Sequence, residues 1–88
     1  MRASRCAVRA RWTDRFRRDF RAAPPAIQDA FEKQLAFLLH DLRHPSLRAK
    51  KYDAAHELWQ ARVTGAWRFY FQIVGETYLL LTIRSHPK

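Results

Sequence analysis

Arginine, tyrosine and histidine side chains recur at alternating positions in the last third of the sequence. The set is Arg62, Arg68, Tyr70, Tyr78, Arg84 and His86, and the positions between them on the same face hold Gln60, Thr64, Gln72, Leu80 and Thr82. Arginine binds phosphate through paired hydrogen bonds, and tyrosine stacks on an unpaired base. An ordinary solvated sheet face of this size would mix carboxylates with its cations, because like charges on neighbouring strands repel. The pattern therefore favours a phosphate-binding surface over the alternative, a merely basic exposed face.

A second group of cations precedes these positions. Arg48, Lys50 and Lys51 lie in the polar segment from Ser46 to His56, which we expect to be a loop. Such a loop could supply further contacts along a nucleic-acid backbone. A solubilising loop explains the same residues equally well.

The composition points to a polyanionic partner. Seventeen basic and eight acidic side chains give a formal net charge of +9, which favours nucleic acid, an anionic membrane or an acidic protein over a basic surface with no specific partner. No apolar run approaches the roughly 18 residues of a membrane-crossing helix. Cys6 is the only cysteine, so a reducing compartment fits, and a buried thiol is favoured over a nucleophile. We expect a cytoplasmic protein.

Two helices are expected in the first half of the chain. Apolar side chains at helical spacing define them: Trp12, Phe16 and Phe20 in the first, and Ile27, Phe31, Leu35, Leu38 and Leu42 in the second. Thr13 or Asp14 would cap the first helix, and Pro24-Pro25 would separate the two. His40 and His44 have a spacing that could bind a metal, but helix capping is favoured because no cysteine or carboxylate cluster lies nearby. No metal or cofactor is expected.

Four strands complete the expected fold. Their ranges are Arg5–Arg11, Glu57–Thr64, Trp67–Val74 and Thr77–Arg84. The order β-α-α-β-β-β predicts an α+β fold, with two helices packed on one face of a mainly antiparallel four-stranded sheet. Residues 1–88 are expected to form one domain, because so short a chain cannot fill two cores. The residues expected beneath the helices are Trp59, Ala61, Val63, Trp67, Phe69, Phe71, Ile73, Leu79, Leu81 and Ile83.

Three segments carry a resemblance to a known family. HPSLRAKKY, LWQARVTGAWRFYFQI and TYLLLTIRSH, in this order, resemble the RelE/ParE toxin superfamily, and the similarity in element order and length extends over essentially the whole chain. The resemblance implies a toxin that is inhibited by a cognate antitoxin in a hetero-oligomer, with no membrane partner. The RelE and YoeB branches bind the ribosomal A site and cut mRNA there without a metal ion. The ribose 2′-hydroxyl attacks the adjacent phosphate.

Roles for individual residues follow from this resemblance. Arg62 and Arg68 would hold the scissile phosphate, Arg84 would stabilise the developing negative charge, and His86 would transfer a proton, since imidazole titrates near neutrality. Lys50 and Lys51 are similar to the basic loop residues that hold RNA in the family, and we also expect RNA contacts from Arg48, Gln60, Tyr70 and Lys88.

The chain departs from the family pattern at three points. Both branches carry a catalytic tyrosine near the carboxy terminus, where this sequence has Pro87 and Lys88; the glutamate base of the YoeB branch has no match; and Gln60 replaces a lysine of RelE-like members. An mRNA endonuclease is the favoured function. The alternatives are a ParE-like poison of a topoisomerase such as gyrase, without nuclease activity, and a catalytically inactive nucleic-acid-binding member.

Overall fold

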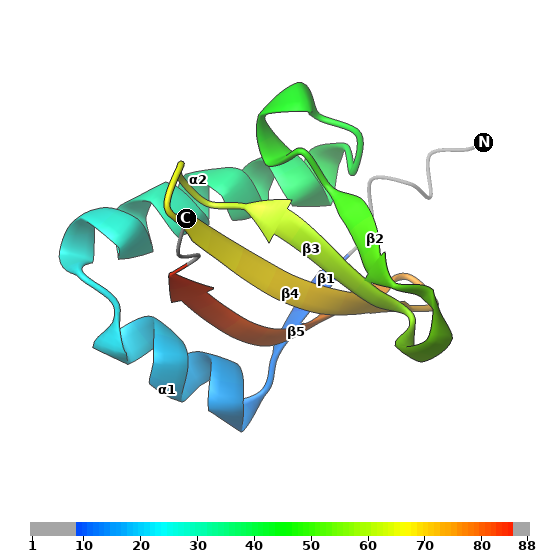
Figure 1. The fold of residues 1–88 in the computed structure, drawn as a ribbon, viewed down its shortest axis with the longest axis horizontal. Coiled ribbons are helices and arrows are strands. Elements are labelled where there is room, and N and C mark those ends of the chain that lie inside the picture. Colours follow the sequence, from blue (N-terminus) through cyan, green and yellow to red (C-terminus); the bar gives the residue numbers. More distant parts are fainter. Residues whose placement is uncertain (1–8, 86–88) are drawn as a thin grey trace.

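The structure, a computed structural model, describes residues 9–85 as an α+β fold (Figure 1). Its five-stranded sheet has the strand order β1-β5-β4-β3-β2, in which only the β1–β5 pair is parallel. In chain order the elements, with η for 3₁₀ helices, are β1 (Arg9–Trp12), α1 (Asp14–Ala22), α2 (Pro25–His40), η2 (Pro45–Leu47), β2 (Lys50–Asp53), η3 (Ala54–His56), β3 (Leu58–Arg62), β4 (Trp67–Val74) and β5 (Thr77–Ser85).

The fifth strand, β2, corrects the prediction of a basic loop and of a four-stranded sheet. Lys50 lies opposite Gln60 of β3, and the register then shifts before Asp53 pairs with Leu58. A strand of four residues is too short to produce a clear periodic signal in the sequence. The free edge of β3 nevertheless needs partners for its backbone N–H and C=O groups, and the segment after η2 supplies them.

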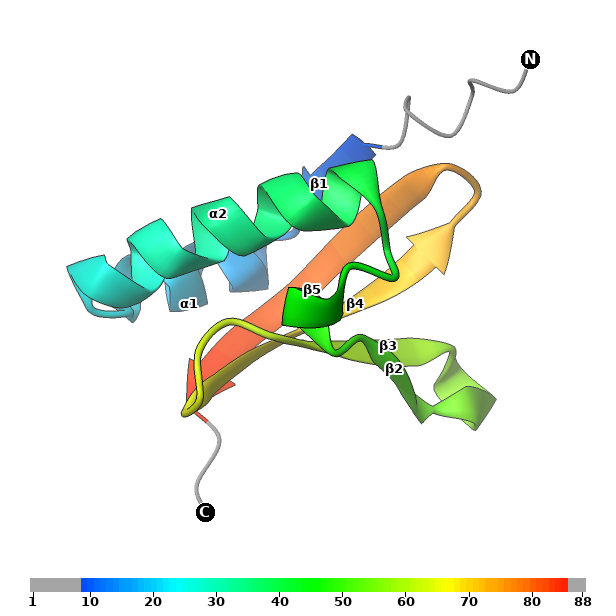
Figure 2. The same cartoon turned by 90° about the horizontal axis from the view of Figure 1, so that it is seen from above.

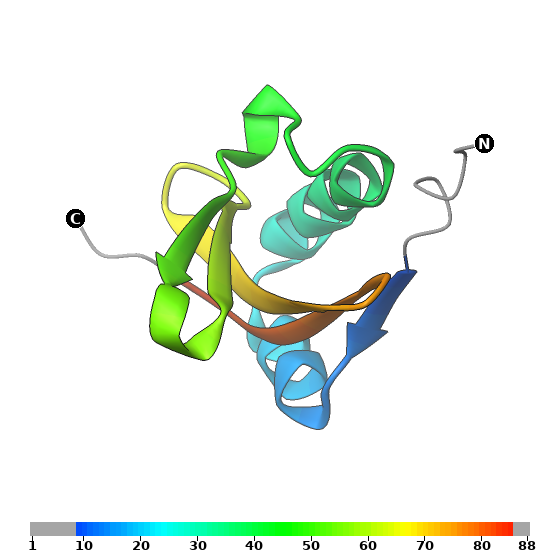
Figure 3. The same ribbon diagram turned by 90° about the vertical axis from the view of Figure 1, so that its right-hand side faces the viewer.

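The helices occupy different places around the sheet. Helix α2 lies over one face of the sheet, whereas α1 runs beside β5 (Figures 2 and 3). Strand β1 pairs with Thr77 to Leu80 of β5, and α1 follows the part of β5 beyond that pairing. The prediction of two helices on one face is therefore confirmed for α2. Helix α1 instead lies along β5, beyond the part of that strand that pairs with β1.

Thr13 caps α1 and joins it to β5. Its hydroxyl oxygen accepts a hydrogen bond from the backbone N–H of Phe16 at 3.1 Å, and the hydroxyl donates to the carbonyl oxygen of Leu80 at 2.8 Å. Of the two predicted caps, Thr13 is therefore the one used. The same side chain satisfies a free helix N–H and fixes the helix to the sheet.

Aromatic rings fill the core between the helices and the sheet. The ring of Trp12 lies edge-on to Phe16 and Phe20, each at 5.0 Å between centroids, and Phe31 of α2 lies edge-on to Phe69 of β4 at the same distance. Phe16, Phe31 and Phe69 are fully buried. Edge-to-face pairs add to the stabilisation that comes from burial alone. The predicted aromatic stripe is confirmed, although Trp12 belongs to β1.

A β-bulge in β5 makes part of the predicted core wrong. Tyr70 pairs with Thr82, but the next residue of β4, Phe71, pairs with Leu80, so Leu81 is an extra residue in β5. Leu80 is fully buried and Tyr78 is 7% exposed, whereas Leu79 and Leu81 are only half-buried. Burial and the nearby carboxylate of Asp41 raise the pKa of the Tyr78 phenol. Tyr78 and Leu80 were expected on the open face, and Leu79 and Leu81 beneath the helices.

Histidine positions are consistent with structural roles. His44 follows α2, its Nδ1 accepts a hydrogen bond from the backbone N–H of Ser46 at 3.2 Å, and its ring stacks on Phe37 at 3.9 Å. His40 lies in the last turn of α2. Within residues 9–85, no three histidine, cysteine or acidic side chains come together as metal ligands would. No helix in the same range is long and apolar enough to span a bilayer.

The bulge predicts which of two adjacent leucines stabilises the fold. We expect Leu80→Ala to lower the free energy of unfolding by about 2–5 kcal/mol, the usual cost of a core leucine. Leu81→Ala should cost only about 1 kcal/mol, because its side chain keeps access to solvent. Urea unfolding of both variants measures the difference. The reverse order would mean that simple alternation along β5 is right and the bulge is wrong.

Candidate functional site

Three arginines form one row across the sheet. Arg62 of β3 lies opposite Arg68 of β4, and Arg68 lies opposite Arg84 of β5. Directly opposed residues of antiparallel strands share a face, so the arginine row lies on the face turned away from α2, as alternation predicts. Arg84 is exposed and the other two are half-buried. None of the ion pairs found among residues 9–85 involves this row.

Arg68 differs from its neighbours because it holds the turn between β3 and β4. Its Nη1 donates to the carbonyl oxygens of Thr64 at 2.7 Å, Trp67 at 3.0 Å and Gly65 at 3.3 Å. These bonds stabilise the turn and offset repulsion between the guanidinium groups of the row. Arg68 is therefore a structural residue of the site, whatever else it contacts.

Gln34 of α2 fixes the backbone of the row from the opposite face of the sheet. This side chain is 5% exposed. Its Nε2 donates to the carbonyl oxygens of Arg62 at 2.8 Å and Ser46 at 3.1 Å, and its Oε1 accepts from the Ser46 hydroxyl at 2.9 Å. The burial of Gln34 was not predicted, although a polar residue three positions after Phe31 and four before Leu38 falls on the apolar face of the helix. A buried amide with all these partners is costly to remove.

A hollow of about 410 Å³ lies beside the arginine row. We call it the tyrosine hollow, and it is lined by Arg15, Tyr52, Leu58, Tyr70, Leu81, Thr82, Arg84 and Ser85. The rings of Tyr52 and Tyr70 meet edge-on at 5.3 Å between centroids. The hollow thus combines aromatic rings and aliphatic side chains with the cationic end of the row at Arg84.

Gln60 supports a residue that lines the tyrosine hollow. It is 8% exposed, and its amide oxygen accepts a hydrogen bond from the Tyr70 hydroxyl at 3.2 Å. The side chain that the sequence analysis assigned to RNA contact thereby orients the tyrosine that borders the hollow.

The predicted basic loop divides between two faces. Lys50 lies opposite Gln60 and shares the face of the arginine row. Lys51 lies opposite Trp59 on the other face, with its Nζ 5.7 Å from the centre of the Trp59 ring and 3.5 Å from Glu57 Oε1. Arg48 is exposed at the end of η2, where it adopts the left-handed conformation with φ of 47°. The three cations do not form one cluster.

A polar pair ends β2 next to Tyr52. Asp53 Oδ2 lies 2.8 Å from His56 Nδ1, and this hydrogen bond lowers the pKa of the Asp53 carboxyl. The carbonyl oxygen of His56 accepts a hydrogen bond from Gln72 Nε2 at 2.9 Å, which joins η3 to β4. This corner holds the end of the strand that carries Tyr52. His56 is thus part of η3 and not of an open loop.

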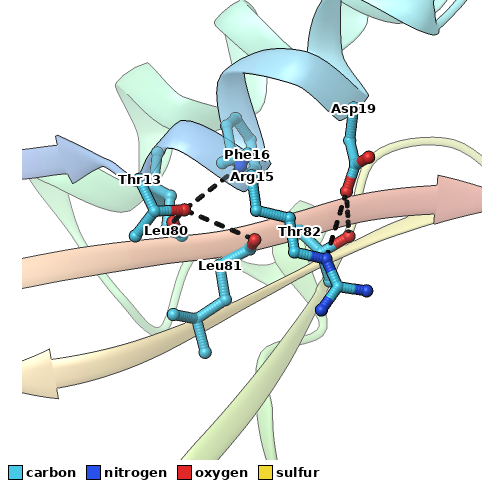
Figure 4. A network of polar contacts seen from close by, with 7 residues as sticks. All are labelled: Thr13, Arg15, Phe16, Asp19, Leu80, Leu81 and Thr82. Carbon is cyan, nitrogen blue, oxygen red and sulfur yellow. Dashed lines mark hydrogen bonds and ion pairs between the residues drawn. The ribbon is translucent and has the colours of Figure 1, made fainter.

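Helix α1 contributes two residues that the sequence analysis did not identify. Asp19 Oδ2 accepts a hydrogen bond from the Thr82 hydroxyl at 2.5 Å and lies 3.8 Å from Arg15 Nε (Figure 4). Arg15 lines the tyrosine hollow. Nothing in the spacing of α1 shows which of its arginines faces the sheet. His86 and Lys88, both predicted site residues, lie outside the described residues.

Comparison with known proteins gives a fold. No protein-family model and no curated protein matches the sequence. A chain of the archaeal RelE–RelB complex from Pyrococcus horikoshii matches the structure with a TM-score of 0.75 at 14% identity, over 92% of this chain and 97% of that one. The chain has the RelE-type fold.

Two further solved structures share the RelE-type fold. The YoeB/ParE toxin from Agrobacterium tumefaciens matches with a TM-score of 0.73 at 13% identity, over 90% of this chain and 99% of that one. A chain of the RelBE2 toxin–antitoxin complex from Mycobacterium tuberculosis matches with a TM-score of 0.69 at 23% identity, over 91% and 98%. The fold inferred from the three sequence segments is confirmed, with one more strand than expected.

Arg68 gives a prediction about stability. We expect Arg68→Gln to lower the free energy of unfolding by about 1–2 kcal/mol, because three carbonyl oxygens lose a charged donor. Arg62→Gln removes the same charge from the same row and should change stability by less than about 0.5 kcal/mol. Urea unfolding at one salt concentration measures both. Equal effects would mean that the turn does not depend on Arg68.

Proposed function

We propose that this protein is the toxin of a toxin–antitoxin pair and cleaves mRNA in the ribosomal A site without a metal ion. The observation that carries the proposal is the position of Arg84. This residue lies in the arginine row, opposite Arg68, and also lines the tyrosine hollow. A phosphate at Arg84 would thus have an aromatic hollow beside it for an adjoining base. The RelE-type fold supports the same function class.

The proposed reaction has three requirements, and we assign residues of this chain to two of them. The 2′-hydroxyl oxygen attacks the adjacent phosphorus while its proton leaves, the bond from phosphorus to the 5′-oxygen breaks, and that oxygen takes up a proton. Arg62 and Arg84 neutralise the charge that develops on the phosphate oxygens, together with Arg68. His86 follows Arg84 by two residues in the sequence, and we assign it one of the proton transfers. The products are a 2′,3′-cyclic phosphate and a 5′-hydroxyl end.

Arg84 provides the direct test of this function. We expect the protein to cut mRNA on programmed ribosomes, and Arg84→Ala to cut about 10²-fold more slowly, the usual loss of one charge-stabilising donor. Arg43→Ala is the matched control, because Arg43 is exposed, carries the same charge and lies beyond α2. Cleavage is followed on gels with end-labelled mRNA. Absence of cleavage by the unaltered protein, with inhibition of gyrase supercoiling instead, would establish the topoisomerase alternative.

His86 provides a test of the proton transfer. His86→Ala should leave ribosome binding nearly intact while cleavage falls by about 10²-fold or more, because general acid–base catalysis acts mainly on the transition state. Binding is measured by co-sedimentation with ribosomes, and cleavage by single-turnover assays. An unchanged cleavage rate would remove His86 from the mechanism and leave the cations alone to account for catalysis.

The proposed protein partner is an antitoxin. Of the three matched structures described above, one is a RelE–RelB complex and one a RelBE2 toxin–antitoxin complex. A net charge of +9 suits an acidic or amphipathic segment laid across the helices or a sheet edge. We expect the complex to survive about 0.5 M salt, where the Debye length is below 8 Å, since apolar burial persists when charge is screened. Gel filtration at low and high salt measures this. Complete dissociation at moderate salt would contradict it.

A further inference from the structure

Helix α1 brings a fourth arginine to the candidate site. Arg15 lines the tyrosine hollow together with Arg84, Tyr70 and Thr82, although it comes from the opposite end of the described chain. Its side chain is 65% exposed, so its guanidinium remains accessible to a ligand. The other cations of this face come from the sheet itself, and α1 adds one from beside β5.

Asp19 holds this arginine from the sheet side. The Asp19 carboxylate accepts a hydrogen bond from Thr82, which is 9% exposed, and this bond fixes the carboxylate against β5. Its contact with Arg15 is to Nε, at 3.8 Å. Figure 4 shows the two terminal nitrogens of Arg15 directed away from Asp19. Asp19 therefore restrains Arg15 at Nε and leaves its two terminal nitrogens available to another anion.

We propose that Arg15 binds a phosphate of the RNA strand next to the scissile one, and that Asp19 and Thr82 position it. The proposal rests on the function proposed above and extends it to a residue outside the arginine row. A strand with one phosphate at Arg84 and a base in the tyrosine hollow would hold its neighbouring phosphate close to the same hollow, which Arg15 lines from α1. A guanidinium fork is suited to that contact.

Two variants of α1 test whether Arg15 contacts RNA. Arg15→Ala and Arg18→Ala remove the same charge from the same helix, but Arg18 is exposed and does not line the hollow. We expect Arg15→Ala to weaken binding of a fluorescein-labelled ten-nucleotide single-stranded RNA by about fivefold or more, and to reduce the slope of log K against log salt by about 0.7. Arg18→Ala should weaken binding less than twofold. Equal effects of the two variants would overturn the proposal.

Asp19→Asn tests the positioning role separately. Removing a negative charge near RNA should tighten binding if the carboxylate acts only through its charge. If Asp19 positions Arg15, the variant should bind RNA about twofold or more weakly, and it should have no further weakening effect in the Arg15→Ala background. Tighter binding by the same factor in both backgrounds would exclude the positioning role. Thermal unfolding of each variant checks that the fold is retained.

Arg84→Ala in the same RNA assay separates this proposal from the proposed function. Loss of affinity in Arg84→Ala but not in Arg15→Ala would overturn only the role of Arg15. No loss in either variant would remove RNA binding from this face and with it the proposed function. If Arg15→Ala weakened only the complex with the antitoxin, the residue would belong to a protein interface, and the proposal would be wrong.

Discussion

The bulge at Leu81 allows one strand to serve both the core and the candidate site. Tyr78 and Leu80 must be buried, while Thr82 and Arg84 must lie on the opposite face, and all four have the same parity in the sequence. A regular strand would put them on one side. The extra residue changes the side at Leu81, so Leu80 belongs to the core cluster that includes Phe31 and Leu38 of α2, while Arg84 still pairs with Arg68 on the other face.

The bulge also determines where α1 begins. The Thr13 hydroxyl lies 2.8 Å from the carbonyl oxygen of Leu80 and 3.5 Å from that of Leu81, the two residues at the bulge. Because Thr13 caps α1, the irregular backbone of β5 sets the start of that helix (Figure 4). Six residues after Thr13, or about 1.7 helical turns, Asp19 reaches Thr82. The core, the arginine row and the residue of α1 that lines the hollow therefore all depend on the same part of β5.

The sequence predicts the elements better than it predicts their irregularities. Helical spacing located both helices, and alternation placed Arg62, Arg68 and Arg84 together. The bulge gave no signal, because Leu79-Leu80-Leu81 is apolar at both parities and fits either face. Strand β2 was missed because four residues with three polar side chains read as a loop.

The candidate site was only partly predictable for a related reason. Positions on one sheet follow from alternation, but contacts between distant elements do not. Arg15 became part of the hollow only through the docking of α1 on β5, and the exposed arginines of α1 are alike in sequence. Gln60 and Arg68 were correctly placed on the open face, yet their hydrogen bonds to Tyr70 and to the turn carbonyls depend on side-chain geometry that spacing does not reveal.

The parallel pairing of β1 with β5 has a consequence for the order of assembly. Thr13 and Leu80 are 67 residues apart in the sequence, so the ends of the described chain meet only after a large loop has closed. Closing such a loop is slow compared with forming the hairpins between β3, β4 and β5, which join neighbouring residues. During synthesis α1 emerges long before β5, the strand on which it docks. A chain lacking β5 has neither the third arginine of the row nor the strand against which α1 docks, so the arginine row and the tyrosine hollow are complete only after that strand has been made.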